Sequence, residues 1–236
     1  MDMDFRRVKQ IQEKIMQGDS MDKVSVIIRN RNEEQYIGFA IQSVLDNLRG
    51  SEIIIVDNNS TDDSLNVVSM FRPILKEKLK IINIDSYSPG AALNEGVKHC
   101  KYDTVLILSA HAQITDICLH RLEIDLRQHV AVFGNQTPIY RGKKISKRYI
   151  WSHFTCERHQ NLRSHIEHRL FLHNAFCFYN KHTLLENPFD ETLQGIEDRY
   201  WAIDMVKKGH TYMYDGENQY CNHFWTPNGA TWKGIG

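Results

Sequence analysis

Alternation of short apolar runs with helical patterns is the feature that most constrains the fold of this chain. The apolar runs have the length of buried strands and lie at residues 24–28, 53–56, 79–84 and 104–109. The helical patterns lie between them at residues 37–48, 61–71 and 90–99. Elements in this order predict an α/β fold, with a mostly parallel central sheet and helices on both of its faces.

The second half of the chain gives weaker patterns, from which we predict a smaller and mixed lobe. Two helices are expected there, at residues 115–126 and 197–208. Three strands are expected, at residues 130–133, 171–179 and 212–214. Residues 222–229 read as a loop.

An amphipathic helix is predicted at the N-terminus, within residues 1–20. Residues 4–17 place apolar side chains at helical spacing, with lysine and arginine elsewhere. Such a helix either packs on the surface of its own domain or lies on a membrane surface. The sequence leaves both alternatives open.

Composition and charge narrow the class of protein. The chain has 236 residues, enough for one domain with a sizeable core. Its 29 Lys and Arg balance 29 Asp and Glu, so no nucleic-acid partner is expected. Five scattered cysteines without a CxxC pair indicate reduced thiols in the cytoplasm. No apolar run approaches the roughly 20 residues that span a bilayer, and the charged N-terminus argues against a secretory signal.

Polar side chains follow the first two apolar runs, at the point where each predicted strand ends. The first run leads into Arg29-Asn30-Arg31-Asn32-Glu33 and the second into Asp57-Asn58-Asn59-Ser60. In an open parallel sheet, ligands bind in the crevice beyond the carboxyl ends of the strands. The chain therefore predicts a small-molecule site at this edge, although the second segment alone also fits a turn with a helix cap.

These segments and two later ones resemble the family 2 glycosyltransferases of the GT-A fold. Asn32-Glu33 matches the end of the polar segment after the family's first strand, and residues 57–62 match its Asp-Asp/Asn-x-Ser-Thr-Asp segment. Residues 107–114 and 195–201 are similar to two further segments of the family, the second being its C-terminal Glu-Asp motif. The order and spacing of the segments carry the resemblance, because each alone is weak.

The resemblance implies a single GT-A domain over residues 1–236. Residues 21–112 would form the half that binds the nucleotide-sugar, and residues 113–236 the acceptor-binding and catalytic half. The nucleotide contacts expected from the resemblance and from the neighbouring motif positions are Arg29, Asn30, Arg31, Glu33, Asp57, Asn59, Gly90, Asn94, Ser109, Ala110 and His111.

The segment Ser109-Ala110-His111 stands where most members of the family carry Asp-x-Asp, which usually holds the ribose and a divalent metal. The leaving nucleotide is negatively charged, so a positive group must meet it. One alternative is a Mn²⁺ or Mg²⁺ ion bound by His111 and by His223, which resembles a C-terminal metal ligand of some GT-A enzymes. A second is a metal-independent transfer in which protonated His111 and an arginine stabilise the leaving group. A structural histidine is the third.

The Glu197-Asp198 pair is the predicted catalytic centre. By resemblance to the family, Asp198 is the general base that takes the proton of the acceptor hydroxyl in an inverting transfer, while Glu197 contacts or orients the acceptor. Taken alone, the pair also fits acidic charge at a helix N-terminus. Asn174 and Trp201 are candidate contacts for the acceptor or sugar, with core packing as the alternative for the tryptophan.

A basic tract at residues 141–170 bears on the acceptor. It holds eight Lys or Arg against Glu157 and Glu167. An anionic acceptor, such as a lipid-linked phosphate sugar or an acidic polysaccharide, is one interpretation, and a solvated surface helix is the other. A zinc site at His165 and His168 is disfavoured because no cysteine lies within finger spacing.

The function implied by the resemblance is transfer of a sugar from a nucleotide-sugar donor to a glycan or lipid-linked acceptor. Surface polysaccharides such as capsule, O-antigen or lipooligosaccharide are the expected products, made in the cytoplasm or at the inner face of the membrane. The rival is a non-catalytic nucleotide- or sugar-binding module that retains the fold. A nucleotidyltransferase and a dinucleotide oxidoreductase are disfavoured, because residues 29–38 hold one glycine and no GxGxxG follows the first strand.

Overall fold

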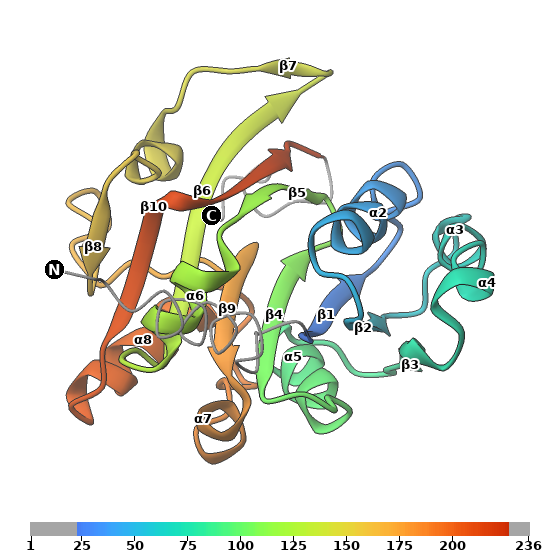
Figure 1. The fold of residues 1–236 in the computed structure, drawn as a ribbon, viewed down its shortest axis with the longest axis horizontal. Helices are drawn as coiled ribbons and strands as arrows, with labels where there is room; N and C mark the ends of the chain where they lie inside the picture. The colour runs from blue at the N-terminus through green and yellow to red at the C-terminus, as the bar shows by residue number, and fades with distance from the viewer. Residues whose placement is uncertain (1–22, 227–236) are drawn as a thin grey trace, which may run out of the picture.

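The computed structural model describes residues 23–226 and confirms the expected α/β fold. The described strands form one 10-stranded sheet in the order β3-β2-β1-β4-β9-β6-β10-β5, with β7 on β6 and β8 on β10 (Figure 1). The strands are β1 (Ser25–Asn30), β2 (Glu52–Asp57), β3 (Leu79–Asn83), β4 (Thr104–Ser109), β5 (Ala112–Ile117), β6 (Ala131–Tyr140), β7 (Lys143–Lys144), β8 (Arg158–Gln160), β9 (Phe176–Asn180) and β10 (Tyr212–Phe224). The helix expected at residues 4–17 lies outside the described residues.

The first half of the sheet, β3-β2-β1-β4, is parallel, as predicted. Side chains of β1 alternate between the two faces of the sheet. Ile27 packs against α5 (Pro89–Lys98), whereas Val26 and Ile28 belong to the apolar cluster that includes α2 (Ile37–Asn47). Burial on both faces explains why these strands read as continuous apolar runs.

The helix expected over residues 61–71 is wrong in detail. The chain instead forms α3 (Ser64–Ser69) and then α4 (Arg72–Leu75), which contains Pro73 in its first turn. Proline is tolerated there because the first N–H groups of a helix have no partner within it. A short 3₁₀ turn, η1 (Lys76–Lys78), then leads into β3.

The second half of the sheet is mixed and departs further from the prediction. Residues 115–126, expected as one helix, form the end of β5 and then α6 (Leu119–Leu126). The strand expected to end at residue 133 continues as β6 to Tyr140. The strand expected from residue 171 begins as β9 only at Phe176.

The last strand shows the largest departure. It was expected at residues 212–214 and followed by a loop, but β10 runs continuously to Phe224. His223 is therefore a strand residue, paired in register with Pro138 of β6 and with Ala112 of β5. Because these partners lie far away along the chain, local sequence pattern does not report the pairing. The two remaining helices are α7 (Lys181–Glu186) and α8 (Glu197–Lys207), the second as predicted within one residue.

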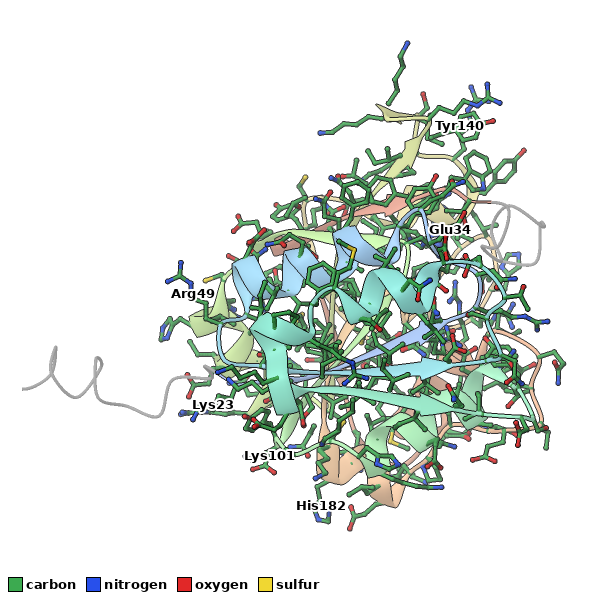
Figure 2. The ribbon with its side chains drawn as sticks, turned by 90° about the vertical axis from the view of Figure 1, so that its right-hand side faces the viewer. Lys23, Glu34, Arg49, Lys101, Tyr140 and His182 are labelled. Atoms are coloured by element: carbon green, nitrogen blue, oxygen red, sulfur yellow. The ribbon has the colours of Figure 1, made fainter. Side chains whose placement is uncertain are left out.

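The basic tract at residues 141–170 contains no α-helix, so the expectation of a surface helix is wrong. The tract forms β7, the 3₁₀ turn η2 (Tyr149–His153) and β8. Arg158 is a structural residue, since its guanidinium pairs with the buried carboxylates of Asp125 and Asp215. Other cations are exposed at the tip of the β6–β7 hairpin, beyond Tyr140 in Figure 2, and these are Arg141, Lys143 and Lys144.

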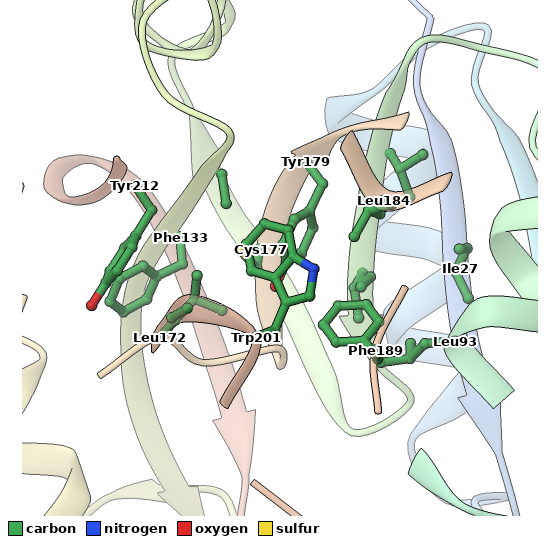
Figure 3. Close-up of a cluster of buried hydrophobic side chains, with 14 of the residues drawn as sticks. Ile27, Leu93, Phe133, Leu172, Cys177, Tyr179, Leu184, Phe189, Trp201 and Tyr212 are labelled. Carbon is green, nitrogen blue, oxygen red and sulfur yellow. The ribbon is translucent and has the colours of Figure 1, made fainter. Parts of the chain in front are cut away.

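Apolar clusters cover both faces of the sheet. Figure 3 shows the cluster in which Trp201 of α8 packs beside Tyr179 of β9 and Phe189. The rings of Trp201 and Tyr179 meet edge to face, with centroids 5.1 Å apart. Within residues 23–226, every helix is too short or too polar to cross a bilayer.

Candidate active site

The carboxyl ends of β1 and β4 meet at one edge of the sheet, where the sequence predicts the site. Arg29 of β1 lies in register with Val56 of β2 and with Ser109 of β4. The segment before β9 reaches the same edge, because β9 is antiparallel to β4 and the Ser109 N–H donates to the carbonyl of Ala175 at 3.0 Å. The segments brought together there are residues 29–33, 57–60, 109–111 and 173–175.

The two predicted catalytic carboxylates, Glu197 and Asp198, lie in the first turn of α8. Ile196, the residue before this helix, has φ of 54°. A β-branched residue is rare in this left-handed region, and such strain costs roughly 1–3 kcal/mol. The surrounding structure therefore holds a sharp backbone turn directly before the acidic pair.

Asp198 is buried and fully hydrogen-bonded. Its Oδ2 accepts from the backbone N–H of Asn174 and from Nη1 of Arg199, both at 2.9 Å. Its Oδ1 accepts from the backbone N–H of Arg199 at 2.9 Å and from Nη1 at 3.0 Å. Because a carboxylate has about four lone-pair positions, all are in use here. Asp198 can take a proton from a substrate only after Arg199 leaves one of its oxygens.

Glu197 is equally buried but less constrained. Its Oε1 accepts from Nδ2 of Asn174 at 3.3 Å and lies 3.4 Å from Nη1 of Arg29. Its carboxylate also accepts from the backbone N–H of Glu197 itself. Burial raises the pKa of Glu197 above its ordinary value, and the positive charge of Arg29 opposes part of that increase. Glu197 thus has a raised pKa and, unlike Asp198, no bidentate contact with an arginine.

Asp57 and Asn30, at the ends of β2 and β1, are bound to each other. Nδ2 of Asn30 donates to Oδ1 of Asp57 at 2.7 Å, and the Ser60 hydroxyl donates to the same oxygen at 2.6 Å. Oδ2 of Asp57 accepts one bond, from the Ser60 backbone N–H at 3.0 Å. The alternative of a hydrogen-bonded turn is therefore realised at Asp57, and one lone pair of Oδ2 remains for a ligand.

Three enclosed side-chain atoms at this edge have no hydrogen-bond partner among residues 23–226. They are Oδ1 of Asn30, Oε2 of Glu33 and Nδ2 of Asn58. Buried polar atoms are rarely left unpaired, because each costs about 1–3 kcal/mol. Two acceptors and one donor beside the ends of β1 and β2 are a fitting set for a polar, planar ligand group.

Gly90 and Asn94 of α5 have a packing role in this structure. A Cβ at Gly90 would lie 2.5 Å from the backbone carbonyl oxygen of Asp190. Asn94 brackets the backbone of Phe189, since Nδ2 donates to its carbonyl and Oδ1 accepts from its N–H, both at 2.9 Å. These contacts account for both residue types without a nucleotide.

His111 lies at the turn between β4 and β5 and contacts Glu33. Nδ1 of His111 is 3.0 Å from Oε1 of Glu33, and Nε2 is 3.2 Å from the hydroxyl of Ser109. Both ring nitrogens thus already have protein partners. The ring of His223 lies beside that of His111, with centroids 5.0 Å apart. Ala110, between the two motif positions, is buried and contributes no polar side-chain atom.

Two further histidines are joined through one glutamine. Gln136 of β6 contacts Nδ1 of His173 at 3.1 Å and Nδ1 of His223 at 2.8 Å. Burial lowers the pKa of both histidines well below the ordinary value, and the neighbouring Arg199 for His173 and His111 for His223 lower it further. His173 and His223 are therefore neutral at pH 7.

The residues at this edge do not fit a Mn²⁺ or Mg²⁺ site. Residues 23–226 contain no group of three or more His, Cys, Asp or Glu side chains that could hold a metal ion. His111 and His223 supply two nitrogens, whereas these cations prefer oxygen ligands. Ser109 and His111 stand where most members of the family carry the two carboxylates of Asp-x-Asp. The reaction proposed below therefore uses only side chains of the protein.

The remaining predicted residues divide into exposed and buried ones. Trp201 is 3% exposed and its Nε1 donates to the carbonyl of Asn187 at 2.7 Å, so the structure favours core packing over a sugar platform. Arg31 and Asn59 are exposed at the strand ends. Asn174 is buried and contacts both carboxylates of the acidic pair, so it orients them.

Four residues of the site were absent from the sequence prediction: Asn58, Gln136, His173 and Arg199. Arg199 and His173 each adjoin a predicted residue, and Asn58 lies inside the second polar segment. Gln136 gave no signal, because it lies beyond the strand predicted at residues 130–133, between the polar residues Asn135 and Thr137. Its two histidine partners come from other strands and segments, which the sequence does not place beside it.

A known family matches more than half of the chain. The family model of glycosyl transferase family 2 matches residues 25–186. The described sheet, with its parallel half and mixed half, is the GT-A fold of the solved glycosyltransferases that it matches. The chain therefore belongs to glycosyl transferase family 2.

Individual relatives are more distant. An uncharacterised glycosyltransferase of Nostoc sp. is 37% identical over 89 residues, which cover 37% of this chain and 28% of the relative. The minor teichoic acid biosynthesis protein GgaA of Bacillus subtilis is 25% identical over 211 residues, or 83% of this chain and 46% of the relative. The chain thus spans less than half the length of these two curated relatives.

Two solved structures show the same fold. S. aureus TarS residues 1–349 in complex with UDP-GlcNAc matches with a TM-score of 0.66 and 21% identity, over 88% of this chain and 60% of that one. GalNAc-T7 with UDP, GalNAc and Mn²⁺ matches with a TM-score of 0.68 and 14% identity, over 88% of this chain and 44% of that one.

Proposed function

We propose that the chain is an inverting glycosyltransferase that moves a sugar from a nucleotide-sugar to a glycan or lipid-linked acceptor in surface polysaccharide biosynthesis. The observation that carries the proposal is the buried acidic pair, Glu197 and Asp198, held at the same sheet edge as Arg29 and the unpaired polar atoms of β1 and β2. A proton acceptor and a polar ligand site on one edge are what a direct sugar transfer needs. The proposed location is the cytoplasm, with peripheral contact at the inner face of a membrane.

The donor is proposed to be a UDP-sugar, lying across the ends of β1 and β2. Two of the structurally similar proteins were solved with such ligands, TarS with UDP-GlcNAc and GalNAc-T7 with UDP and GalNAc. The unpaired atoms of Asn30, Glu33 and Asn58 offer partners to the base and ribose. Arg29 and the exposed Arg31 would meet the diphosphate, because a guanidinium binds phosphate oxygens in pairs.

In the proposed reaction, the acceptor hydroxyl attacks the anomeric carbon as the bond to the nucleotide diphosphate breaks, with inversion at that carbon. Asp198 takes the hydroxyl proton. Since Arg199 occupies both oxygens of Asp198, we expect acceptor binding to displace it from one. Glu197 holds Arg29 near the leaving diphosphate, and Asn174 fixes the distance between the two carboxylates.

The acceptor side is proposed to lie next to the β6–β7 hairpin. Arg141, Lys143 and Lys144 are exposed at its tip and form no ion pair within residues 23–226. Unpaired positive charge in an otherwise neutral protein attracts an anionic acceptor. A relative's role in minor teichoic acid biosynthesis agrees with a phosphate-rich surface polymer.

The test is turnover by Asp198→Asn. We expect kcat to fall by about 100- to 10,000-fold, because a general base contributes that much, while the Kd for UDP by calorimetry changes less than about twofold. Asp204→Asn, on the exposed side of the same helix, is the matched control and should keep full activity. Unchanged turnover in Asp198→Asn would contradict the assigned base. Absence of turnover by the wild type with every UDP-, GDP-, CMP- and dTDP-sugar, despite binding, would favour the non-catalytic module.

A further inference from the structure

Gln136 joins two histidines, the half-buried His173 and the buried His223, that the proposed reaction leaves without a role. It belongs to β6, which lies between β9 and β10 in the sheet (Figure 1). On one side its amide is 3.1 Å from Nδ1 of His173, and on the other it is 2.8 Å from Nδ1 of His223. A carboxamide has one end that donates and one that accepts, so the two histidines cannot be bound in the same way.

One backbone contact decides which histidine meets which end. The N–H of Ala175 donates to Nδ1 of His173 at 3.2 Å. A backbone N–H is always a donor, so Nδ1 of His173 carries no hydrogen and the group of Gln136 that faces it must be the NH₂. The carbonyl oxygen of Gln136 then faces His223, whose Nδ1 must carry a hydrogen to donate.

Both rings are neutral, and a neutral imidazole carries only one ring N–H. The state of Nδ1 therefore determines whether Nε2 carries a hydrogen. Burial depresses the pKa of each histidine, which removes the doubly protonated form at neutral pH. His173 therefore carries its hydrogen on Nε2, and His223 has a bare lone pair on Nε2. Neither Nε2 is hydrogen-bonded to a residue of the described range 23–226, so each has an unused hydrogen-bonding position.

We propose that Gln136 is a positioning residue that, together with the backbone N–H of Ala175, fixes opposite tautomers on His173 and His223, so that the pair presents one N–H donor and one lone-pair acceptor to a hydroxyl-bearing sugar ring. The ring centroids are 5.9 Å apart, close enough for one sugar ring to be touched by both. This second part of the proposal rests on the proposed function, whereas the tautomers do not.

The chemistry of this pair selects against an anion and for a polyol. A phosphate oxygen can accept from His173 but has no hydrogen to give to the lone pair of His223. A sugar hydroxyl can both donate and accept, and neighbouring hydroxyls of one ring can satisfy both nitrogens. The diphosphate is then left to the arginines, and the histidines contact the sugar.

The tautomers can be read directly by NMR. Long-range ¹H–¹⁵N correlation spectra of labelled, unliganded protein distinguish a protonated Nδ1 from a protonated Nε2, with His173→Gln and His223→Gln supplying the assignments. We expect His173 as the Nε2–H form and His223 as the Nδ1–H form. The same tautomer on both rings, or a doubly protonated ring at pH 7, would overturn the inference whether or not the protein transfers sugar.

Gln136→Met separates positioning from mere packing. It removes the acceptor of the His223 Nδ1–H, whereas the N–H of Ala175 still donates to Nδ1 of His173. We therefore expect the His223 signals to lose their preference for the Nδ1–H form and those of His173 to keep the Nε2–H form. Gln113→Met, on β5, is the control and should leave both unchanged. A spectrum of Gln136→Met with His223 still wholly in its Nδ1–H form contradicts the proposal, and wild-type spectra decide if this variant fails to fold.

Binding measurements test the ligand class. Gln136→Met should weaken binding of the best nucleotide-sugar by about fivefold, the value of one neutral hydrogen bond, and leave the Kd of the parent nucleotide unchanged. An equal loss of affinity for the nucleotide-sugar and for the nucleotide would show that the two histidines do not contact the sugar. Selective broadening of the His223 signals by Mn²⁺ alone would place a cation on that nitrogen and overturn the hydroxyl assignment.

Discussion

The two halves of the sheet organise their strand-end polar groups in different ways. In the parallel half, Asn30, Asp57 and Ser60 are bound to one another inside a compact turn, and Asn94 is bound to backbone. In the mixed half, Asn174 joins the two carboxylates of the acidic pair and Gln136 joins two histidines, so each amide links side chains of separate segments. The hydrogen-bonded turn of the parallel half forms a rigid platform, whereas the linked side chains of the mixed half can exchange hydrogen-bond partners with a ligand. Substitutions should therefore reduce stability in the parallel half and change activity or binding in the mixed half.

Trp201→Ala gives the largest expected effect. Trp201 is the exception within the mixed half, because its substitution should reduce stability rather than activity. Trp201 is a core residue, so we expect the free energy of unfolding to fall by about 3–5 kcal/mol. The KM for donor and acceptor should stay within about twofold in protein that remains folded. Denaturant unfolding and steady-state kinetics measure the two quantities, with the exposed Tyr200→Ala as control. A raised KM without loss of stability would restore the sugar-platform interpretation.

Asp57→Ala should be the most damaging polar substitution in the parallel half. It removes one acceptor of the buried Asn30 amide, which keeps its contacts with the Ser60 and Ser64 hydroxyls, and the acceptor of both the backbone N–H and the hydroxyl of Ser60, so we expect a loss of about 2–4 kcal/mol in unfolding free energy. Urea titration measures it. Asp63→Asn, exposed in the same turn, should change stability by less than about 0.5 kcal/mol. If Asp57→Ala loses only nucleotide affinity, the rigid-platform description is wrong.

Gly90→Ala tests the close approach of α5 to the segment after α7. The added methyl would meet a backbone oxygen at 2.5 Å, and backbone cannot move aside cheaply. We expect a loss of about 1–3 kcal/mol, seen as a lower thermal midpoint. Gly195→Ala is the matched control, because a methyl added there would meet no atom of residues 23–226 within 4 Å. Equal stability of the two variants would remove the packing explanation for Gly90.

Glu197→Gln should have the smallest effect on stability and the most characteristic pH dependence. The pKa of Glu197 is raised by burial, so its ionisation destabilises the folded protein as pH rises through that pKa. The glutamine variant lacks this contribution. We expect its stability relative to the wild type to increase as the pH rises from about 4 towards 7, while kcat falls about tenfold. A pH-independent difference in unfolding free energy would contradict the raised pKa.

The parallel half could be predicted from the sequence because its elements are coded locally. Continuous apolar runs at Ser25–Asn30 and Glu52–Asp57 are buried on both faces, and a helical stripe follows each. The helix boundaries near Pro73 were predicted less well, since a proline that ends one helix in a sequence pattern can equally begin the next. Motif residues in this half were placed at the correct edge for the same local reason.

The mixed half was predicted poorly because long-range pairing decides it. β10 lies between β6 and β5, with a register shift between Asp215 and Tyr220, and neither feature has a local pattern. His223 was named from the family resemblance but placed in a loop, so its contact with Gln136 could not be foreseen. The acidic pair was located correctly on α8, whereas the hold of Arg199 on Asp198 depends on side-chain geometry that spacing does not report.

The position of β9 has a consequence for how the polypeptide matures. β4 pairs on one side with β1, which precedes it, but on the other side with β9, which emerges from the ribosome only after four intervening strands have been made. During that interval β4 is an apolar edge strand whose backbone N–H and C=O groups are unpaired on one side. Exposed edges of this kind promote aggregation of nascent chains. Slow synthesis across β5 to β8 would prolong that exposure, so the yield of active protein should depend on translation speed in that stretch.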